Sequence, residues 1–282
     1  MLIDTHTHLD TFSDTEIAEI LARAKDAGVG SVVSVGTTVE SSAQAVRLSA
    51  VFPQIFAGVG VHPMDLRGPI NDETYASLLK LATSSNKVLM ISEIGLDFKE
   101  GMPDRAMQFQ AFRQQIRLAR ELKKPIVFHS RDSHPDTLRV LREEQAYEVR
   151  GIMHYFQADA PTARKAIDLG FYISLAKPLL RVHSLQQVAA RLPLDHIVLE
   201  TDSTPQPFKA RRENWTEPRH LRDIAAKLAE LQGKSMEEVK EVTSQNFLSV
   251  IGSGKDIFQR TLDMGARTLP SGAREQSQLP NS

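Results

Sequence analysis

Residues 2–8, Leu-Ile-Asp-Thr-His-Thr-His, open the chain with a short apolar run that ends in two histidines. Seven further short runs rich in β-forming residues follow it. They span residues 31–36, 55–61, 88–94, 126–129, 152–156, 171–175 and 197–202. Most of the intervening stretches carry helical patterns, and Ser13 with Glu16 and Ser235 with Glu238 have the spacing of reciprocal helix caps. This alternation of strands and helices predicts a parallel sheet.

The number of these units favours a closed barrel. Uninterrupted apolar runs, such as residues 197–199, suit parallel strands that are covered by helices on one face and by the filling of a barrel on the other. An open, doubly wound sheet with extra strands would give similar local patterns. Because eight units follow one another, we predict the α/β class, as a single-domain (β/α)8 TIM barrel that spans residues 1–252.

The last part of the chain differs in composition. After residue 251 the sequence turns polar, gains prolines and glycines, and shows little sustained periodicity. We therefore expect residues 253–282 to be a polar C-terminal tail that is mostly mobile. An alternative for its first part is a short amphipathic helix that docks on the barrel through Ile257, Phe258 and Leu262.

Composition limits the chemistry that this chain can perform. Hydrophobic residues make up 41% and charged residues 24% of the 282 residues, enough for a sizeable core. No cysteine is present, which excludes disulfides and thiolate sites, so a metal ion would need histidines and carboxylates. The chain starts without a secretory signal and no run reaches the length of a membrane span, so we expect a cytoplasmic protein. Because the formal net charge is only −1, nucleic-acid binding would depend on local sites.

Ionisable residues gather where a barrel of this type carries its chemistry, at the carboxyl ends of the strands and in the loops that follow. The residues at these positions are His6, His8, His62, Glu93, His129, His154 and Asp202. Side chains two apart on a strand point the same way, so His6 and His8 can direct both imidazoles toward one ion. A His-x-His pair alone is weak evidence, but candidates from five other strands reach the same rim. Together they indicate a metal site.

Two acidic residues fit this interpretation. Glu93 lies inside an otherwise apolar strand, where an unpaired buried carboxylate would be costly and a bridged metal ion would remove that cost. Pairing with a structural arginine or with the backbone is the alternative. Asp202 offers a ligand that can also accept a proton from a water molecule. Glu200, two residues earlier, is expected to give structural support.

The residues at these strand ends resemble those of a known family, the TatD-type metal-dependent deoxyribonucleases of the amidohydrolase superfamily. The resemblance covers residues 2 to about 252. It rests on Asp-Thr-His-Thr-His at 4–8, Gly-Val-His-Pro at 60–63, Glu-Ile-Gly-Leu-Asp at 93–97, His-Ser-Arg at 129–131 and Glu-Thr-Asp at 200–202. Two segments depart from the family pattern. His-Tyr-Phe-Gln-Ala at 154–158 replaces His-x-Phe-Ser-Gly, and Asn-Trp-Thr-Glu-Pro at 214–218 replaces Asn-x-Pro.

This resemblance implies a ligand set for two divalent metal ions. The implied ligands are His6, His8 and Asp202 for one ion, His129 and His154 for a second, and Glu93 as a bridge or as the residue that completes the pair. Asp202 and Glu93 would be the catalytic residues, with Asp202 both ligand and base. The family activity is magnesium-dependent, whereas four imidazoles favour Zn²⁺ or Mn²⁺, so the expected ions are Mg²⁺, Zn²⁺ or Mn²⁺.

The resemblance also implies an activity, the hydrolysis of phosphodiester bonds in DNA by a water molecule that two metal ions activate. We expect 3′ to 5′ removal from single-stranded ends by a monomer that needs no membrane. A hydrolase of a small amide, lactone or ester is an alternative, because its metal site would look nearly identical. However, Glu93 stands where many such enzymes carry a carbamylated lysine. The third alternative is a noncatalytic barrel that binds nucleic acid or protein, and the complete ligand set argues against it.

Positive side chains on the same rim are candidates for contacts with substrate phosphates. Lys209, Arg211 and Arg212 follow the last strand, and Arg131 lies two residues beyond a candidate ligand. The alternatives are a solvated loop for the first three and a carboxylate partner for Arg131. We expect His62 to lie near the site and to contact substrate rather than to bind a metal ion.

Overall fold

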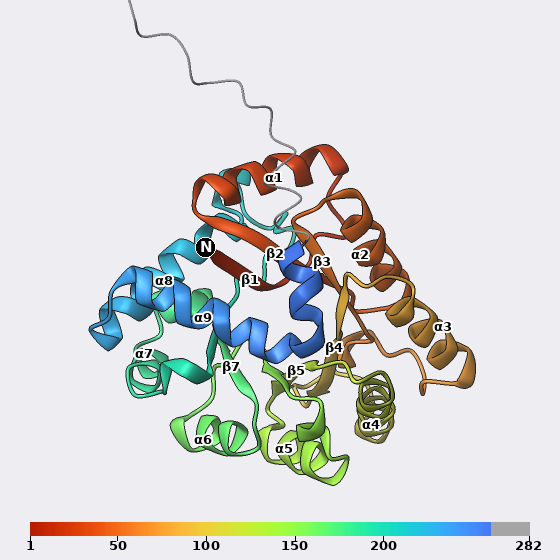
Figure 1. Ribbon diagram of the computed structural model, residues 1–282. Coiled ribbons are helices and arrows are strands. Elements are labelled where there is room, and N and C mark those ends of the chain that lie inside the picture. The colour runs from red at the N-terminus through yellow and green to blue at the C-terminus, as the bar shows by residue number, and fades with distance from the viewer. Residues whose placement is uncertain (261–282) are drawn as a thin grey trace, which may run out of the picture.

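The computed structural model describes residues 1–260, and eight parallel strands form a ring at its centre (Figure 1). Each strand pairs with the next one in the sequence. The strands are β1 (Leu2–Thr7), β2 (Val29–Val35), β3 (Ile55–Val59), β4 (Val88–Asp97), β5 (Ile126–Arg131), β6 (Gly151–Met153), β7 (Tyr172–Leu175) and β8 (Ile197–Leu199). The predicted (β/α)8 TIM barrel is therefore confirmed.

A helix follows each strand and lies on the outside of the ring (Figure 1). The helices are α1 (Asp14–Asp26), α2 (Val39–Val51), α3 (Asp72–Thr83), α4 (Arg105–Leu122), α5 (His134–Glu143), α6 (Ala160–Asp168), α7 (His183–Ala189), α8 (Leu221–Gln232) and α9 (Met236–Ile251). Ser13 and Glu16 form the predicted reciprocal cap of α1, and Ser235 accepts a hydrogen bond from the backbone of Glu238 at the start of α9. These caps satisfy backbone groups that a helix start leaves unpaired.

The barrel closes where β1 meets the segment after β8. Thr7 and Ser203 form a parallel bridge, the backbone N–H of Asp202 donates to the carbonyl oxygen of His6 at 3.0 Å, and that of His8 donates to Ser203 at 2.8 Å. Below this seam the buried carboxylate of Asp4 accepts hydrogen bonds from the backbone and hydroxyl of Thr201. The hydrogen bonds of closure thus fix the histidines of β1 beside Asp202.

Apolar side chains fill the amino-terminal end of the barrel, and α9 lies across it (Figure 1). Residues 255–260 are helical, and the buried ring of Phe258 stacks on Phe56 of β3, with ring centroids 4.4 Å apart. The packed part of the chain therefore reaches Phe258, beyond residue 252 where we placed the boundary of the barrel. Leu262 and the rest of the predicted tail lie outside the described residues.

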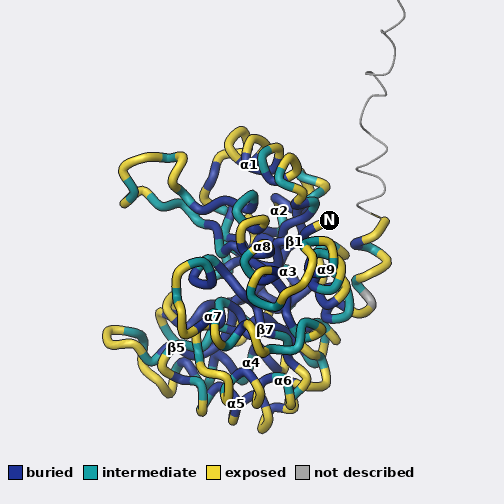
Figure 2. Tube along the Cα trace, turned by 90° about the vertical axis from the view of Figure 1, so that its left-hand side faces the viewer, coloured by how far each residue is buried: buried dark blue, intermediate teal, exposed yellow. Residues whose placement is uncertain are grey.

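Burial follows the layers of the barrel. Figure 2 shows buried residues along the central strands, whereas exposed residues gather on the outer turns of the helices and on the connecting loops. In α1, for example, Ile17, Leu21 and Ala24 recur three or four positions apart and face the core. Within residues 1–260, no helix has the length and apolar character that crossing a membrane requires.

The loop after β8 is held in place by one buried carboxylate. Glu217, whose side chain is only 4% exposed, accepts hydrogen bonds from Arg23 of α1 at 2.9 and 3.0 Å and from Arg212 at 3.0 Å. Arg219 lies 3.3 Å from the same carboxylate. Burial alone would raise the pKa of Glu217, but the arginines lower it below its ordinary value. This cluster anchors the loop that carries the predicted phosphate contacts.

We predict that Glu217→Gln lowers the free energy of unfolding by about 1–3 kcal/mol at pH 7, because charged hydrogen bonds in a largely buried cluster are lost. The lowered pKa of Glu217 means that its stabilisation is present above the ordinary carboxyl pKa of about 4.3 and is lost as the pH falls through the folded-state pKa. The difference between wild type and variant in urea unfolding should therefore shrink in acid. Glu213→Gln, at an exposed position of the same loop, should leave unfolding unchanged, and equal effects of both variants would contradict the prediction.

Candidate metal centre

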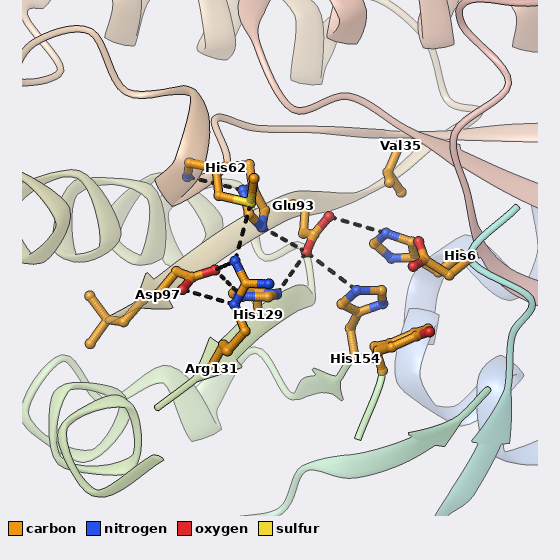
Figure 3. Close-up of polar contacts among 12 residues, drawn as sticks. His6, Val35, His62, Glu93, Asp97, His129, Arg131 and His154 are labelled. Carbon is orange, nitrogen blue, oxygen red and sulfur yellow. Dashed lines mark hydrogen bonds and ion pairs between the residues drawn. The ribbon is translucent and has the colours of Figure 1, made fainter. Parts of the chain in front are cut away.

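Glu93 lies at the centre of a group of imidazoles at the carboxyl end of the barrel (Figure 3). Its Oε2 lies 3.3 Å from Nε2 of His6 and 3.6 Å from Nε2 of His8. Its Oε1 lies 3.3 Å from Nε2 of His154 and 3.5 Å from Nδ1 of His129. The two carboxylate oxygens therefore face two different sets of nitrogen atoms, one on β1 and one contributed by β5 and the end of β6.

Asp202 joins this group from the seam of the barrel. Its Oδ1 lies 3.3 Å from Nε2 of His8, and its side chain is 27% exposed, so it faces both the centre and the mouth of the barrel. The backbone of Asp202 has a φ of 52°, in the left-handed region, directly before the bridge between Ser203 and Thr7. Three overlapping groups of side chains bring ligand atoms within 4.8 Å of one another. They are His6, His8 and Glu93; His6, His154 and Asp202; and His62, Glu93 and His129.

The charges of this pocket compensate one another. Burial alone would raise the pKa of Glu93, but the nearby imidazoles of His62 and His154 hold it well below its usual range. Burial opposes the charge of His154, yet Glu200 and Glu93 raise its pKa to about 10. The pKa of Asp202 is lowered to about 2, because contacts with histidines outweigh its burial. A buried set of carboxylates that needs this much positive charge is suited to a divalent cation.

His6 provides a second indication that the donor set fits a metal ion. The residue is fully buried, and burial together with repulsion from His154 lowers its pKa. Among the described residues, its Nδ1 has no hydrogen-bond partner. A neutral imidazole in a buried pocket is the form that binds a metal ion, and carboxylates beside it complete a mixed nitrogen and oxygen donor set.

Two of these imidazoles are hydrogen-bonded from outside to an acceptor, and a third faces a carboxylate without a hydrogen bond. Nε2 of His129 is hydrogen-bonded to Oδ2 of Asp97 at 2.9 Å, and Nδ1 of His8 to the carbonyl oxygen of Val35 at 3.3 Å. Nδ1 of His154 lies 2.9 Å from Oε1 of Glu200. Glu200 itself is fully buried and accepts hydrogen bonds from the hydroxyl of Ser174 and the backbone of Tyr155, the supporting position expected for it. Outer partners of this kind fix the ring orientation of metal ligands.

Asp97, which the sequence analysis assigned no role, links the centre to its rim. It is fully buried, it contacts His129, and its Oδ1 and Oδ2 lie 3.0 Å from Nε and 2.6 Å from Nη2 of Arg131 (Figure 3). The parallel register places Asp97 of β4 opposite Arg131 of β5 and Gly95 opposite His129. Gly95 has a φ of 142°, and a Cβ there would lie 2.1 Å from the carbonyl oxygen of His129, so only glycine permits this close approach. Asp97 could have been predicted from the sequence, since it is an acidic residue at the end of a strand, as the other candidate ligands are ionisable residues at strand ends.

The structure separates the basic residues that we predicted as phosphate contacts. Arg131 reaches the rim of the centre and is 38% exposed, although Asp97 also engages it. Lys209 donates to the carbonyl oxygen of Asn214 at 2.9 Å, and the exposed side chain of Arg211 lies 3.9 Å from Glu213. Arg212 points away from a substrate role, because its guanidinium pairs with Glu217 and lies over the rings of Phe12 and Trp215.

His62 lies closer to the centre than its sequence position revealed. Its Nε2 is 3.2 Å from Oε1 of Glu93, and its ring meets that of His129 edge to face with centroids 4.7 Å apart. It directly precedes a 3-10 turn, Pro63–Asp65, whose backbone places its ring over the mouth. The seven predicted residues are thus all brought to one end of the barrel.

A (β/α)8 barrel whose carboxyl end gathers histidines around a buried glutamate defines a metal-dependent hydrolase with an amidohydrolase-like fold. The family model TatD related DNase matches residues 3–252, and the chain belongs to the TatD family.

Relatives agree with this assignment. The chain is 33% identical over 252 residues to the uncharacterized metal-dependent hydrolase YabD of Bacillus subtilis strain 168, covering 87% of this chain and 97% of that protein. It is 28% identical over 274 residues to TATDN3 of Mus musculus, a protein named as a deoxyribonuclease without an established activity. The match covers 93% of this chain and 92% of that protein. Among solved structures, the TatD homologue YjjV from Escherichia coli K12 superposes with a TM-score of 0.79 at 26% identity, covering 88% of this chain and 97% of that one.

We predict that Asp97→Asn weakens the binding of Zn²⁺ by about 10–100-fold, the usual effect of losing an outer partner of a metal-ligating histidine. An amide would donate its N–H to Nε2 of His129 and so move the ring proton to Nδ1, the atom that faces Glu93. Titration against a chromophoric chelator measures the affinity. Asp132→Asn removes a charge from the same rim at a left-handed position that asparagine tolerates, and it should bind Zn²⁺ as the wild type does. Equal affinities of Asp97→Asn and wild type would refute the orienting role.

Proposed function

We propose that this chain hydrolyses phosphodiester bonds of DNA, removing nucleotides in the 3′ to 5′ direction from single-stranded ends with two divalent metal ions. The observation that carries the proposal is the division of the Glu93 carboxylate between two sets of donors, Oε2 toward His6 and His8 and Oε1 toward His129 and His154. A carboxylate shared in this way suits a bridge between two ions. The description of the family and the name of TATDN3 support DNA as the substrate.

In this proposal each ion has its own ligands. His6, His8 and Asp202 would hold one, His129 and His154 the other, with Glu93 between them. Imidazole nitrogens favour Zn²⁺ or Mn²⁺, whereas Mg²⁺ would rely on the carboxylates. When bound, such ions supply Lewis-acid activation of a water molecule and neutralise charge on the phosphoryl oxygens.

The side chains of this chain supply the remaining functions. The lowered pKa of Asp202 keeps its carboxylate ionised at neutral pH, and because it is partly exposed at the mouth it would serve as the proton acceptor for a water molecule there. Asp97 faces Nε and Nη2 of Arg131 and so holds the guanidinium in one orientation before a substrate arrives. The remaining N–H groups, on Nη1 and on the free side of Nη2, would donate to the non-bridging oxygens of the substrate phosphate.

A hydrolase of a small amide, lactone or ester remains the second candidate, because the same metal centre would serve it. The cationic side chains of Arg131, Lys209 and Arg211 support DNA, since they suit a chain of phosphates better than a neutral small molecule. A noncatalytic barrel would have no use for Asp202 beside an intact ligand set.

We predict that the wild type shortens end-labelled single-stranded DNA only when a divalent metal ion is present, and that chelation abolishes the reaction reversibly. Glu93→Ala and Asp202→Ala should each lower kcat by at least about 100-fold, the effect of removing a principal catalytic element. Glu213→Gln serves as the matched control, because its carboxylate is exposed and lies outside the centre. Intact DNA beside turnover of a lactone or amide in the same panel would reject DNA as the substrate and retain the metal centre.

We also predict that Lys209→Gln combined with Arg211→Gln reduces the salt dependence of DNA binding. Each phosphate contact to a single strand contributes about 0.7 to the slope of log K against log salt, so the loss of two contacts should lower the slope by about 1.4. Fluorescence anisotropy with a phosphorothioate oligonucleotide, at salt concentrations between about 50 and 200 mM, measures this slope. Lys80→Gln on the outer surface of α3 is the control, and an unchanged slope in the double variant would remove this loop from the binding site.

A further inference from the structure

The five imidazoles around Glu93 are not held alike. A histidine that binds a metal ion through one ring nitrogen usually donates the N–H of the other to a carboxylate or a carbonyl oxygen. His8 has such an acceptor in Val35, His129 has Asp97, and the outer nitrogen of His154 faces Glu200. Within the described residues, the outer nitrogens of His6 and His154 both lack a hydrogen bond, although that of His154 lies 2.9 Å from Glu200. His62 is arranged in the opposite way.

The outer nitrogen of His62 accepts a hydrogen bond instead of donating one. The backbone N–H of Met64 donates to its Nδ1 at 3.1 Å, so His62 serves as the side-chain cap of the turn Pro63–Asp65. A backbone amide is always a donor, and therefore Nδ1 must keep its lone pair. The ring proton of neutral His62 consequently lies on Nε2, the atom 3.2 Å from Oε1 of Glu93.

A neutral His129, the form that a metal ion would bind, carries its proton on the same atom but faces the centre with the other nitrogen. Its Nε2 is turned outward to Asp97, and the Nδ1 lone pair is turned toward Oε1 of Glu93 at 3.5 Å. The two rings touch edge to face (Figure 3). His129 thus presents a lone pair to the centre and His62 presents an N–H, although both lie close enough to Glu93 to be counted as ligands.

We infer that His62 is a hydrogen-bond donor of this centre and not a metal ligand, and that its Nε2–H orients the Glu93 carboxylate through Oε1. The inference deepens the proposed function and rests on its metal centre. An oxygen that accepts this N–H retains a second lone pair for a metal ion, so the donor fixes the rotation of the carboxylate without competing for the site. His62 is then a positioning residue that acts through Glu93.

Burial makes such a donor effective. The side chain of His62 is 7% exposed and that of Glu93 is 4% exposed, so water does not replace the N–H when it is removed. The Met64 amide and the proline at the start of the turn hold the ring in one orientation. A ligand role for His62 would require Nε2 to lose its proton to a metal ion while Nδ1 is still facing an amide donor, leaving the ring anionic or the amide unpaired.

Two substitutions divide the functions of this ring. Asparagine places its side-chain oxygen near the position of Nδ1, so His62→Asn keeps an acceptor for Met64 and removes the inward donor. Glutamine places its amide nitrogen near the position of Nε2, so His62→Gln keeps the inward N–H. The experiment loads wild type, both variants and His129→Ala with Zn²⁺, measures zinc per chain after dialysis, and then follows hydrolysis of bis(p-nitrophenyl) phosphate. Thermal unfolding confirms that each variant is folded.

We expect His62→Asn to hold as much zinc as the wild type and to lose about 100-fold in kcat, in the range found for single preorganised donors. His62→Gln should recover kcat to within about tenfold of the wild type, whereas His129→Ala should lose zinc. Nitrogen-15 spectra of the wild type labelled at histidine should show protonated Nε2 in His62 in the zinc-loaded protein.

Loss of zinc from His62→Asn to the same extent as from His129→Ala, or a zinc-ligated Nε2 in the spectrum, would overturn the inference and leave the proposed function standing. Equal kcat values for His62→Asn and His62→Gln would overturn the donor role. Wild-type protein that binds no zinc would reject the proposed function and this inference with it.

Discussion

A carboxylate buried among imidazoles is the constraint on which the rest of this molecule depends. Glu93 is 3% exposed and lies inside an apolar strand, where a single uncompensated charge would be strongly destabilising. Compensation requires several positive or polar groups at once, and one strand can supply only a few of them, as β1 does with His6 and His8, because only alternate side chains face the interior. A barrel whose strands converge on one mouth meets this requirement, and an open sheet offers fewer neighbours to any one position.

The same constraint explains why the surroundings of the centre are rigid. Closure of the barrel sets His6 beside Asp202 through a backbone hydrogen bond of 3.0 Å, and the register of β4 against β5 sets Asp97 opposite Arg131. These are main-chain interactions, so the distances between ligands follow from the fold and not from side-chain flexibility. Hydrogen bonds to Val35 and Asp97 then determine which ring nitrogen of His8 and of His129 faces inward. The fold therefore determines both the ring orientations and the positions of the donor atoms. Preorganisation of this kind is what catalysis at a metal centre requires.

The sequence predicted what depends on local pattern and missed what depends on register. Eight strands and the residues at their ends could be found because apolar runs and their ends are local features. The position of Asp97 opposite Arg131 could not, because the alignment of two strands is not written in either one. Tyr155 shows the same limit. Its φ of 45° lies just after β6, which ends at Met153, earlier than the predicted residue 156, and the backbone N–H of Tyr155 donates to Glu200, which directly follows β8. Likewise, nothing local to Arg212 indicates that Glu217 and two aromatic rings would engage it.

The charges at the mouth give the proposed reaction a direction. Asp202 stands at the seam of β1 and β8 with a partly exposed carboxylate, and Arg131 stands across Glu93 with a partly exposed guanidinium. A phosphodiester is anionic, so its oxygens are attracted to the arginine and repelled by the aspartate. In the proposed reaction the water that attacks phosphorus must lose a proton, and the ionised carboxylate of Asp202 at the mouth would accept it. In the proposed reaction Arg131, at the end of β5, would therefore meet the phosphate, and Asp202, just after β8, would meet the attacking water.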